Sequence, residues 1–405
     1  STDVSCGNSL DLKSTSSILS VCENGALASS TQSLGLRRCA SVENGCQSLG
    51  RAKMRFLRTL SMKRMTEVVD MRLSQMLGAG RRRFRSRSNE RRRFANLERL
   101  EQRNLLTVIA SFDDGVLSVE SDQDSDTIDV TYDYDNGDLT VTSGGEGVDI
   151  EGLPDDFVLE AIHVEGDGGD DVITVNVANL IVEEQFEIYA EGGEGGDTVQ
   201  VNLSSVNVGV DGTLEVHAEG GQGDDTVGIA ADVLTVDGEA ELEAEGGKGI
   251  DEMTLDLLTV EVTEEGSLDA EVEGGQDDDT LLHVIATDVT IAGEAELAVK
   301  GGKGNDDAIA DFTNITVTES GQLEVELEGG KGNDTADVTV NNLSVAGKLE
   351  VNAEGGPGDD NLTVEADVVS ILDGAEVFVK VDGGPGADTL EVILGDEITV
   401  EDGAI

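Results

Sequence analysis

From residue 107 onward, apolar residues alternate with polar ones in short bursts. In the stretch 197–224 the alternating positions form three bursts: Val199, Val201, Leu203, then Val206, Val208, Val210, then Leu214, Val216, Ala218. Period-two alternation of aliphatic and β-branched residues is typical of strands with one buried face. Asp211-Gly212 marks a bend between the second and third bursts. The pattern predicts three short strands per unit and no helix in this region.

The unit repeats, and each copy contains the six-residue segment Gly-Gly-x-Gly-x-Asp. The closing aspartates of these hexamers recur with a period of about 27 residues. They are Asp171, Asp197, Asp225, Asp251, Asp279, Asp306, Asp334, Asp360 and Asp388. Two hexamers depart from the pattern, with Asp167 at the second position of one and Asp277 at the fourth position of another. A fixed period of this length indicates one structural unit per repeat.

These observations predict an all-β fold, a three-sided parallel β-solenoid of about nine coils of about 27 residues over 165–405. An antiparallel sandwich also uses short strands and glycine turns, but it has no reason to repeat one hexamer at a fixed period. Residues 121–126 resemble a degraded hexamer, so we expect 107–164 to form an N-terminal capping coil with an insertion. The segment 144–149 matches the hexamer off the period, and we interpret it as an ordinary loop.

The hexamer supplies the chemistry of a hard-cation site. Its glycines allow positive φ and close approach of backbone carbonyls, and its last residue adds a carboxylate. Calcium takes six to eight oxygen ligands in flexible geometry, whereas magnesium demands a tight octahedron. The turns contain no histidine or cysteine, which disfavours zinc and copper there.

The segments Gly220–Val227 and Gly329–Ala336 resemble the RTX or haemolysin-type calcium-binding repeat, Gly-Gly-x-Gly-x-Asp-x-U-x with U apolar. The resemblance covers 165–405 and implies calcium ligands from glycine carbonyls and aspartate carboxylates. These residues are Gly192, Gly195, Asp197, Gly220, Gly223, Asp225, Gly246, Gly249, Asp251, Asp279, Gly301, Gly304, Asp306, Gly329, Gly332, Asp334, Gly355, Gly358, Asp360, Gly383, Gly386, Asp388 and Asp171. Family members repeat the motif every nine residues on two sides. Here it occurs once per coil, which implies several ions in a single column along one corner.

The competing interpretation is structural: the turns are tight corners, and their aspartates only accept bonds from backbone N–H groups. Three columns of acidic residues in the strand before each hexamer argue for cations. The first column is Glu191, Glu219, Glu245, Glu273, Glu328, Glu354 and Asp382, interrupted by Lys300. The second is Glu243, Glu271 and Glu326, and the third is Glu187, Glu215, Glu241, Asp269, Glu296, Glu324 and Glu350. Divalent cations would relieve the repulsion, although an acidic rod in high salt would need none.

Charge divides the chain into two parts. Of the 26 basic and 85 acidic residues, 1–105 hold 20 and 9, and the remainder hold 6 and 76. We expect 1–53 to be disordered and not necessarily native, and 54–106 to be a basic leader, partly helical or disordered. Its arginine tract, 81–93, suits an export element better than nucleic acid. Residues 100–106 resemble the LEPR-XLL segment of bacterial surface and secreted proteins, with Gln102 in place of the proline. The four cysteines, all in this part, lack the paired spacings of a zinc site.

We therefore expect a bacterial protein, extracellular or on the cell surface, with a structural or adhesive role, which folds when it binds calcium. Candidate partners besides calcium are cell-surface polysaccharide and another copy at the C-terminal edge; no membrane span is predicted. Alternatives are the non-catalytic repeat region of a larger secreted enzyme or adhesin and an ice- or mineral-binding solenoid. The solenoid histidines, His163, His217 and His283, each stand alone in a strand pattern, so we expect no active site.

Overall fold

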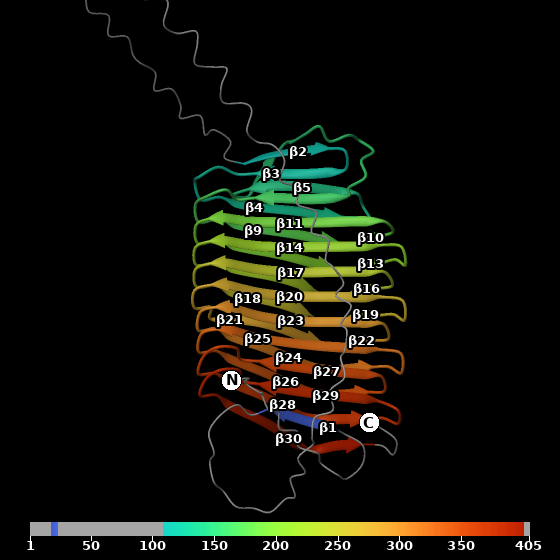
Figure 1. Cartoon of the computed structure of the whole chain (residues 1–405). Coiled ribbons are helices and arrows are strands. Elements are labelled where there is room, and N and C mark those ends of the chain that lie inside the picture. Colours follow the sequence, from blue (N-terminus) through green and yellow to red (C-terminus); the bar gives the residue numbers. More distant parts are fainter. Residues whose placement is uncertain (1–17, 23–107, 401–405) are drawn as a thin grey trace, which may run out of the picture. The chain divides into compact units, whose positions relative to one another are not determined.

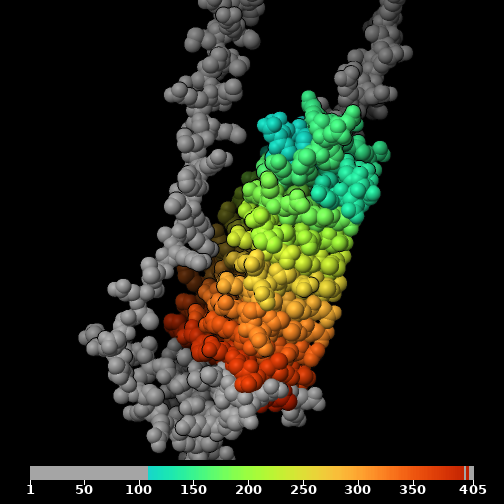
Figure 2. Space-filling model, turned by 90° about the vertical axis from the view of Figure 1, so that its right-hand side faces the viewer, coloured from blue at the N-terminus to red at the C-terminus, as the bar shows by residue number. Residues whose placement is uncertain are grey.

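The computed structural model describes residues 18–22 and 108–400. Within these residues the chain winds into a parallel β-solenoid of about eight turns with a repeat of about 28 residues. The predicted fold class is thus confirmed. The nine closing aspartates mark the ends of about eight turns, one fewer than the nine coils expected. Successive coils occupy successive layers of the described unit, as the colour bands in Figures 1 and 2 show.

One coil shows how the alternating bursts become structure. The bursts of 197–224 form β12 (Thr198–Ser204), β13 (Val206–Val208) and β14 (Thr213–Gln222). Each strand pairs in parallel with its equivalent one coil later, so that Thr198 lies opposite Thr226 and Thr213 opposite Glu239. Stacking satisfies the backbone hydrogen bonds of every inner coil through its two neighbours.

Sheet A contains 13 strands and includes the long strand that precedes each glycine-rich turn. Besides β14, these strands are β8 (Ala161–Glu165), β11 (Gln185–Glu194), β17 (Glu239–Lys248), β20 (Ser267–Gln276), β23 (Glu294–Lys303), β25 (Gln322–Lys331), β27 (Lys348–Glu354) and β29 (Glu376–Asp382). Beyond β29 lies β1 (Ile18–Cys22), which pairs with it in parallel. Of residues 1–53, only this strand belongs to the described residues.

Sheet B contains 17 strands and includes the first two arms of each coil. The first arms are β9 (Val172–Ala178), β12, β15 (Thr226–Ala231), β18 (Glu252–Leu257) and β21 (Leu281–Thr287). The short second arms are β10 (Ile181–Val182), β13, β16 (Leu234–Val236), β19 (Val260–Val262) and β22 (Val289–Ile291). In later coils both arms form one strand: β24 (Asp307–Val317), β26 (Thr335–Val345), β28 (Asn361–Ile371) and β30 (Thr389–Val400).

The core is aliphatic, as the scarcity of aromatic residues requires. Inward positions alternate with outward ones along each strand, and the core side chains are 0% to 7% exposed. In β14 these inward residues are Leu214, Val216 and Ala218. Each fully buried Val, Leu or Ile stabilises the fold by about 1.5 to 3 kcal/mol relative to exposure. Every coil therefore adds a layer of apolar contacts with both of its neighbours.

Aromatic residues gather at the N-terminal end of the solenoid, where the apolar core of the first coil must be shielded from solvent. The strands there are β2 (Ile109–Asp113), β3 (Val116–Glu120), β4 (Thr127–Asp133), β5 (Asp138–Ser143), β6 (Glu146–Val148) and β7 (Ile150–Glu151). Antiparallel pairs β2–β3, β4–β5 and β5–β6 are added there to the parallel pairs β3–β8 and β4–β9. Segment 144–149 forms the β5–β6 turn and β6 itself, so the interpretation of it as an ordinary loop is wrong. Phe112 packs edge-on against Phe157, and Tyr132 stacks on Phe186. These rings cover the first coil.

A second corner, between the first and second arms, depends on side-chain amides that the sequence analysis did not identify. Asn179, Asp288, Asn314 and Asn342 have φ between 54° and 58°, in the left-handed region that asparagine and aspartate tolerate. The Asn314 side-chain amide donates to Asp288 Oδ1 at 2.8 Å, and that of Asn342 donates to Asn314 Oδ1 at 2.5 Å. These bonds join equivalent corners of successive coils.

The basic leader, 54–106, its LEPR-XLL-like segment and its arginine tract lie outside the described residues. In the part of the chain that the structure covers, no helix is long and apolar enough to cross a membrane.

Candidate metal centre

The glycine-rich turns stack so closely that a side chain at the fourth position would overlap the coil before it. Gly223 has φ of 143°, and a Cβ there would lie 1.3 Å from the carbonyl oxygen of Gly195. Equivalent turns show the same approach, since a Cβ on Gly332 would lie 1.3 Å from the carbonyl oxygen of Gly304. The two departures from the motif keep the left-handed backbone, with φ of 61° at Asp167 and 81° at Asp277. At the turns that carry glycine, stacking leaves no room for a side chain, whereas the turn of Asp277 accommodates one with a smaller φ.

The closing aspartates of the hexamers form one buried file along this corner. Their relative exposure is between 0% and 2% in eight coils, at Asp171, Asp197, Asp225, Asp251, Asp279, Asp306, Asp334 and Asp360. In each pair the Oδ1 of one aspartate accepts the backbone N–H of the aspartate one coil earlier, at 2.7 to 3.2 Å. Asp388, which is partly exposed, ends the file by accepting from Asp360. The prediction that the turns align is confirmed.

Where an aspartate or asparagine stands just before the closing aspartate, its side chain forms a second ladder in the opposite direction. Asp224 Oδ1 accepts the N–H of Ile250 at 3.0 Å, and Asp278 Oδ1 accepts that of Asn305 at 2.8 Å. The asparagines at this position do the same, since Asn333 Oδ1 accepts the N–H of Asp359 at 2.9 Å. Aspartate side chains thus do bond to backbone N–H groups, as the structural interpretation required, and they do so between coils.

The second oxygen of each closing aspartate is different, because it is buried and has no hydrogen-bond partner. This holds for Oδ2 of Asp171, Asp197, Asp225, Asp251, Asp279, Asp306, Asp334, Asp360 and Asp388. Each Oδ2 faces the first glycine of its own hexamer. A Cβ on Gly192 would lie 2.7 Å from Asp197 Oδ2 and 2.8 Å from the carbonyl oxygen of Gly220 in the next coil. Carboxylate and carbonyl oxygens therefore converge beside the first glycine of most hexamers.

An unpartnered buried carboxylate oxygen is costly, and a bound proton or a cation would each relieve the cost. Burial raises the pKa of Asp225 and Asp279 to about 7, although in each case a backbone hydrogen bond acts in the opposite direction and neighbouring aspartates add to the rise. For the same leading reason the pKa of Asp251, Asp306 and Asp334 is raised to about 6. The donor set, hard oxygens only, fits a hard cation such as calcium. The file could hold ions through Oδ2, with Oδ1 already bonded.

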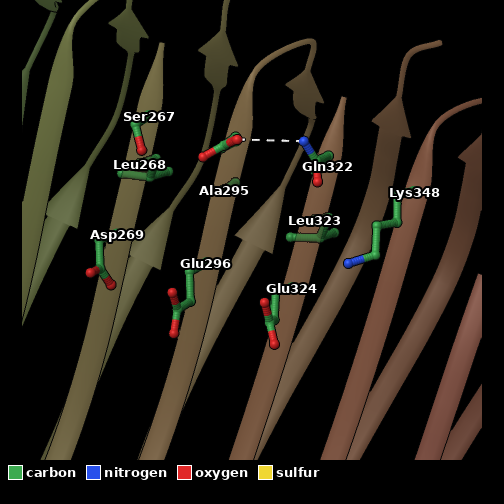
Figure 3. Close-up of a pocket in the computed structure, with 10 residues that line it drawn as sticks. Ser267, Leu268, Asp269, Ala295, Glu296, Gln322, Leu323, Glu324 and Lys348 are labelled. Carbon is green, nitrogen blue, oxygen red and sulfur yellow. Dashed lines mark hydrogen bonds between the residues drawn. The ribbon is translucent and has the colours of Figure 1, made fainter. Parts of the chain in front are cut away.

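The outward face of sheet A carries the predicted acidic columns in register. Glu219 lies between Glu191 and Glu245, and the pairing continues through Glu273 to Lys300. In the third column the side chains of Asp269, Glu296 and Glu324 lie side by side on successive strands, close to Lys348 (Figure 3). Beside them Gln322 donates to Glu294 at 3.4 Å. This face therefore presents aligned carboxylates with few cations among them.

Two groups on this face bring three potential ligand atoms within 4.8 Å of one another among the described residues. One is His217, Glu219 and Glu245, and the other is Glu243, Glu271 and Glu273. The first group was missed because the sequence analysis treated His217 as an isolated surface residue. Burial lowers the pKa of His217, but hydrogen bonds to Glu219 and Glu243 and their charges outweigh it and raise the pKa to about 10. Only the strand register could have revealed these neighbours.

In comparisons with known proteins, no family model matches the chain, and no curated protein or solved structure matches it.

Proposed function

We propose that the chain is a calcium-binding structural repeat protein whose solenoid is completed by ions along the glycine-rich corner. The observation that carries the proposal is the file of buried Oδ2 atoms without hydrogen-bond partners. A carboxylate that is ionised there needs a positive partner, and one such oxygen recurs in every coil. Calcium suits this position because it accepts carboxylate and carbonyl oxygens in irregular arrangements.

The hexamer itself supports calcium over other divalent ions. It resembles the RTX calcium-binding repeat, and its turns offer oxygen donors alone. The two oxygens of each closing aspartate have different roles. Oδ1 accepts a backbone N–H of the neighbouring coil, and Oδ2 is the oxygen that would bind the ion. Carbonyl groups of the first glycines would complete the donor set. The acidic columns of sheet A would attract further ions more weakly, because they are open to solvent.

A biological role follows from this dependence. Where calcium is scarce, the charged file opposes folding; where calcium is plentiful, binding free energy becomes folding free energy. Such behaviour suits a protein that is exported unfolded and folds outside the cell. We accordingly propose an extracellular or cell-surface location in a bacterium and a structural or adhesive role, with no catalysis by this chain.

Circular dichroism of the full chain tests the proposal. Spectra are compared in chelator, in millimolar calcium and in millimolar magnesium at neutral pH. We expect a calcium-specific gain of β signal; identical folded spectra in all three solutions would contradict the proposal. The variant Asp225→Asn keeps an oxygen for the backbone N–H and removes the charge, so it should weaken calcium binding. Its control is Asp224→Asn, which changes the exposed neighbour in the same way and should bind calcium like the wild type.

A further inference from the structure

Three ring side chains lie in register on neighbouring strands of sheet A, among the carboxylates of its outward face. In register, His163 on β8 lies opposite Tyr189 on β11, which lies opposite His217 on β14. The rings of Tyr189 and His217 are stacked, with centroids 5.3 Å apart and planes 7° from parallel. The next residue in this column is Glu243 on β17. His217 therefore lies where the ring column meets the acidic columns.

The imidazole of His217 is held so that its two nitrogens face different groups. Nδ1 lies 3.2 Å from Glu243 Oε2, and Nε2 lies 3.6 Å from Glu219 Oε2. A ligand atom of Glu245 lies within 4.8 Å of those of His217 and Glu219. Nε2 thus faces Glu219, Glu245 belongs to the same group of ligands, and Nδ1 is bonded to a third carboxylate.

This arrangement is the one that metal-binding histidines use. Such histidines almost always donate the other ring N–H to a carboxylate, and carboxylate ligands are themselves hydrogen-bonded. Glu243 provides the first of these supports. Tyr189 provides the second, because its hydroxyl shares its proton between Glu191 Oε2 at 2.9 Å and Glu219 Oε2 at 3.1 Å while its ring stacks on the imidazole. Both supports are in place before any ion binds.

The position is open to an ion from solvent. The side chains of His217 and Glu219 are 25% and 28% exposed. A groove of about 370 Å³ runs along this edge of sheet A, lined by Glu191, Glu219 and Glu245 among others. A hydrated cation could reach the three ligands without any opening of the fold.

We propose that His217 Nε2, Glu219 and Glu245 form a zinc site on the outward face of sheet A, separate from the buried aspartate file. A neutral imidazole with two carboxylates suits a borderline ion such as Zn²⁺, whereas calcium has little use for a nitrogen ligand. Binding displaces the imidazole proton from Nε2 to solvent. Three protein ligands leave a coordination position open for water or for a donor from a partner molecule.

The other histidines provide matched controls. His283 lies in sheet B, and its Nε2 is 3.0 Å from Asp311 Oδ2. Among the described residues, the groups of three that could hold an ion include neither His283 nor His163. His283→Ala therefore removes an imidazole–carboxylate pair of similar geometry without touching the proposed site.

Zinc titration of the full chain in millimolar calcium tests the proposal, with calorimetry for affinity and Co²⁺ absorption as a spectroscopic substitute. We expect the wild type and His283→Ala to bind one more equivalent of zinc than His217→Ala. Tyr189→Phe keeps the stacked ring but loses the hydroxyl, and should weaken this site by about 10-fold to 100-fold. All variants share the leader cysteines, so zinc bound there cancels in the comparison.

Equal zinc binding by the wild type and His217→Ala would overturn the proposal, as would displacement of the extra equivalent by millimolar calcium. Circular dichroism in calcium shows whether each variant is folded. Should His217→Ala fail to fold, Glu245→Gln, which preserves the side-chain shape, provides the same comparison. The zinc proposal can be tested separately from the calcium proposal. Asp225→Asn changes only the buried aspartates, so a folded Asp225→Asn variant should still bind the extra equivalent of zinc.

Discussion

At the residue scale, the two oxygens of each closing aspartate lie in different surroundings. Oδ1 of Asp225 accepts the N–H of Asp197 at 2.7 Å, while Oδ2 has no hydrogen-bond partner. An asparagine could make the first contact equally well, and asparagine does so at the neighbouring position in Asn333. Only the second oxygen gives the aspartate a role that an amide could not fill.

The raised pKa values predict how the calcium-free protein responds to pH. Between about pH 4 and pH 7 the folded state keeps protons on Asp225 and Asp279 that the unfolded chain, with its aspartate pKa near 3.8, has released. Because the folded state binds more protons in this window, stability falls as pH rises through it. Urea unfolding in chelator should therefore give a higher midpoint at pH 5 than at pH 8. Asp279→Asn should reduce this difference, and an unchanged difference would contradict the assignment.

The glycine at the fourth position of the hexamer allows the cost of a steric contact to be measured separately from the cost of backbone strain. Gly223→Ala places a methyl on the carbonyl of Gly195, whereas Gly374, with φ of 88°, has nothing within 4 Å of its added Cβ. Both variants strain the backbone, but only Gly223→Ala forces two coils apart. We expect a loss of about 1 kcal/mol for Gly374→Ala and about 2 to 4 kcal/mol for Gly223→Ala. Chemical unfolding in calcium measures both, and similar losses would contradict the close stacking.

At the element scale, each strand is held in register by the corners at its ends. The glycine-rich corner uses aspartate ladders, and the second corner uses asparagine side chains such as Asn314. The first corner could be predicted because its hexamer recurs in every coil. The second corner could not, because its residues change from Asn179 to Ser205 to Asp288 and form no motif. A left-handed residue recurs at this corner in several coils but not between β15 and β16 or between β18 and β19, so neither a residue type nor a single backbone conformation marks it in the sequence.

The Asn314 corner predicts an unusual order of mutational effects. Asn314 combines φ of 58° with a hydrogen bond to Asp288 at 2.8 Å. Asn314→Gly loses this bond and the bond accepted from Asn342 but keeps the permitted backbone, so at this exposed corner it should cost about 1 kcal/mol. Asn314→Ala loses the same two bonds and also strains the backbone, so it should cost about 2 kcal/mol. Thermal unfolding in calcium should place the glycine variant above the alanine variant; the reverse order would show that this corner is not held as described.

At the scale of the whole molecule, the stacking that buries the core also concentrates negative charge. Carboxylates one coil apart on sheet A lie at strand spacing, where two charges repel by about 1 kcal/mol even in water. The columns could be predicted from the sequence because residues such as Glu219 and Glu245 keep a fixed distance from the hexamer. The contacts of Tyr189 with Glu219 and of His217 with Glu243 could not be predicted from the sequence, because each joins residues on two different strands.

Cations that neutralise the buried file of aspartate oxygens can be located directly. Crystals of the full chain grown in calcium, or in terbium as a substitute, would reveal them through anomalous scattering. We expect a line of anomalous peaks along the glycine-rich corner, one coil apart and each next to an aspartate Oδ2. A folded solenoid with peaks only on the outer face of sheet A, and none along this corner, would contradict this expectation.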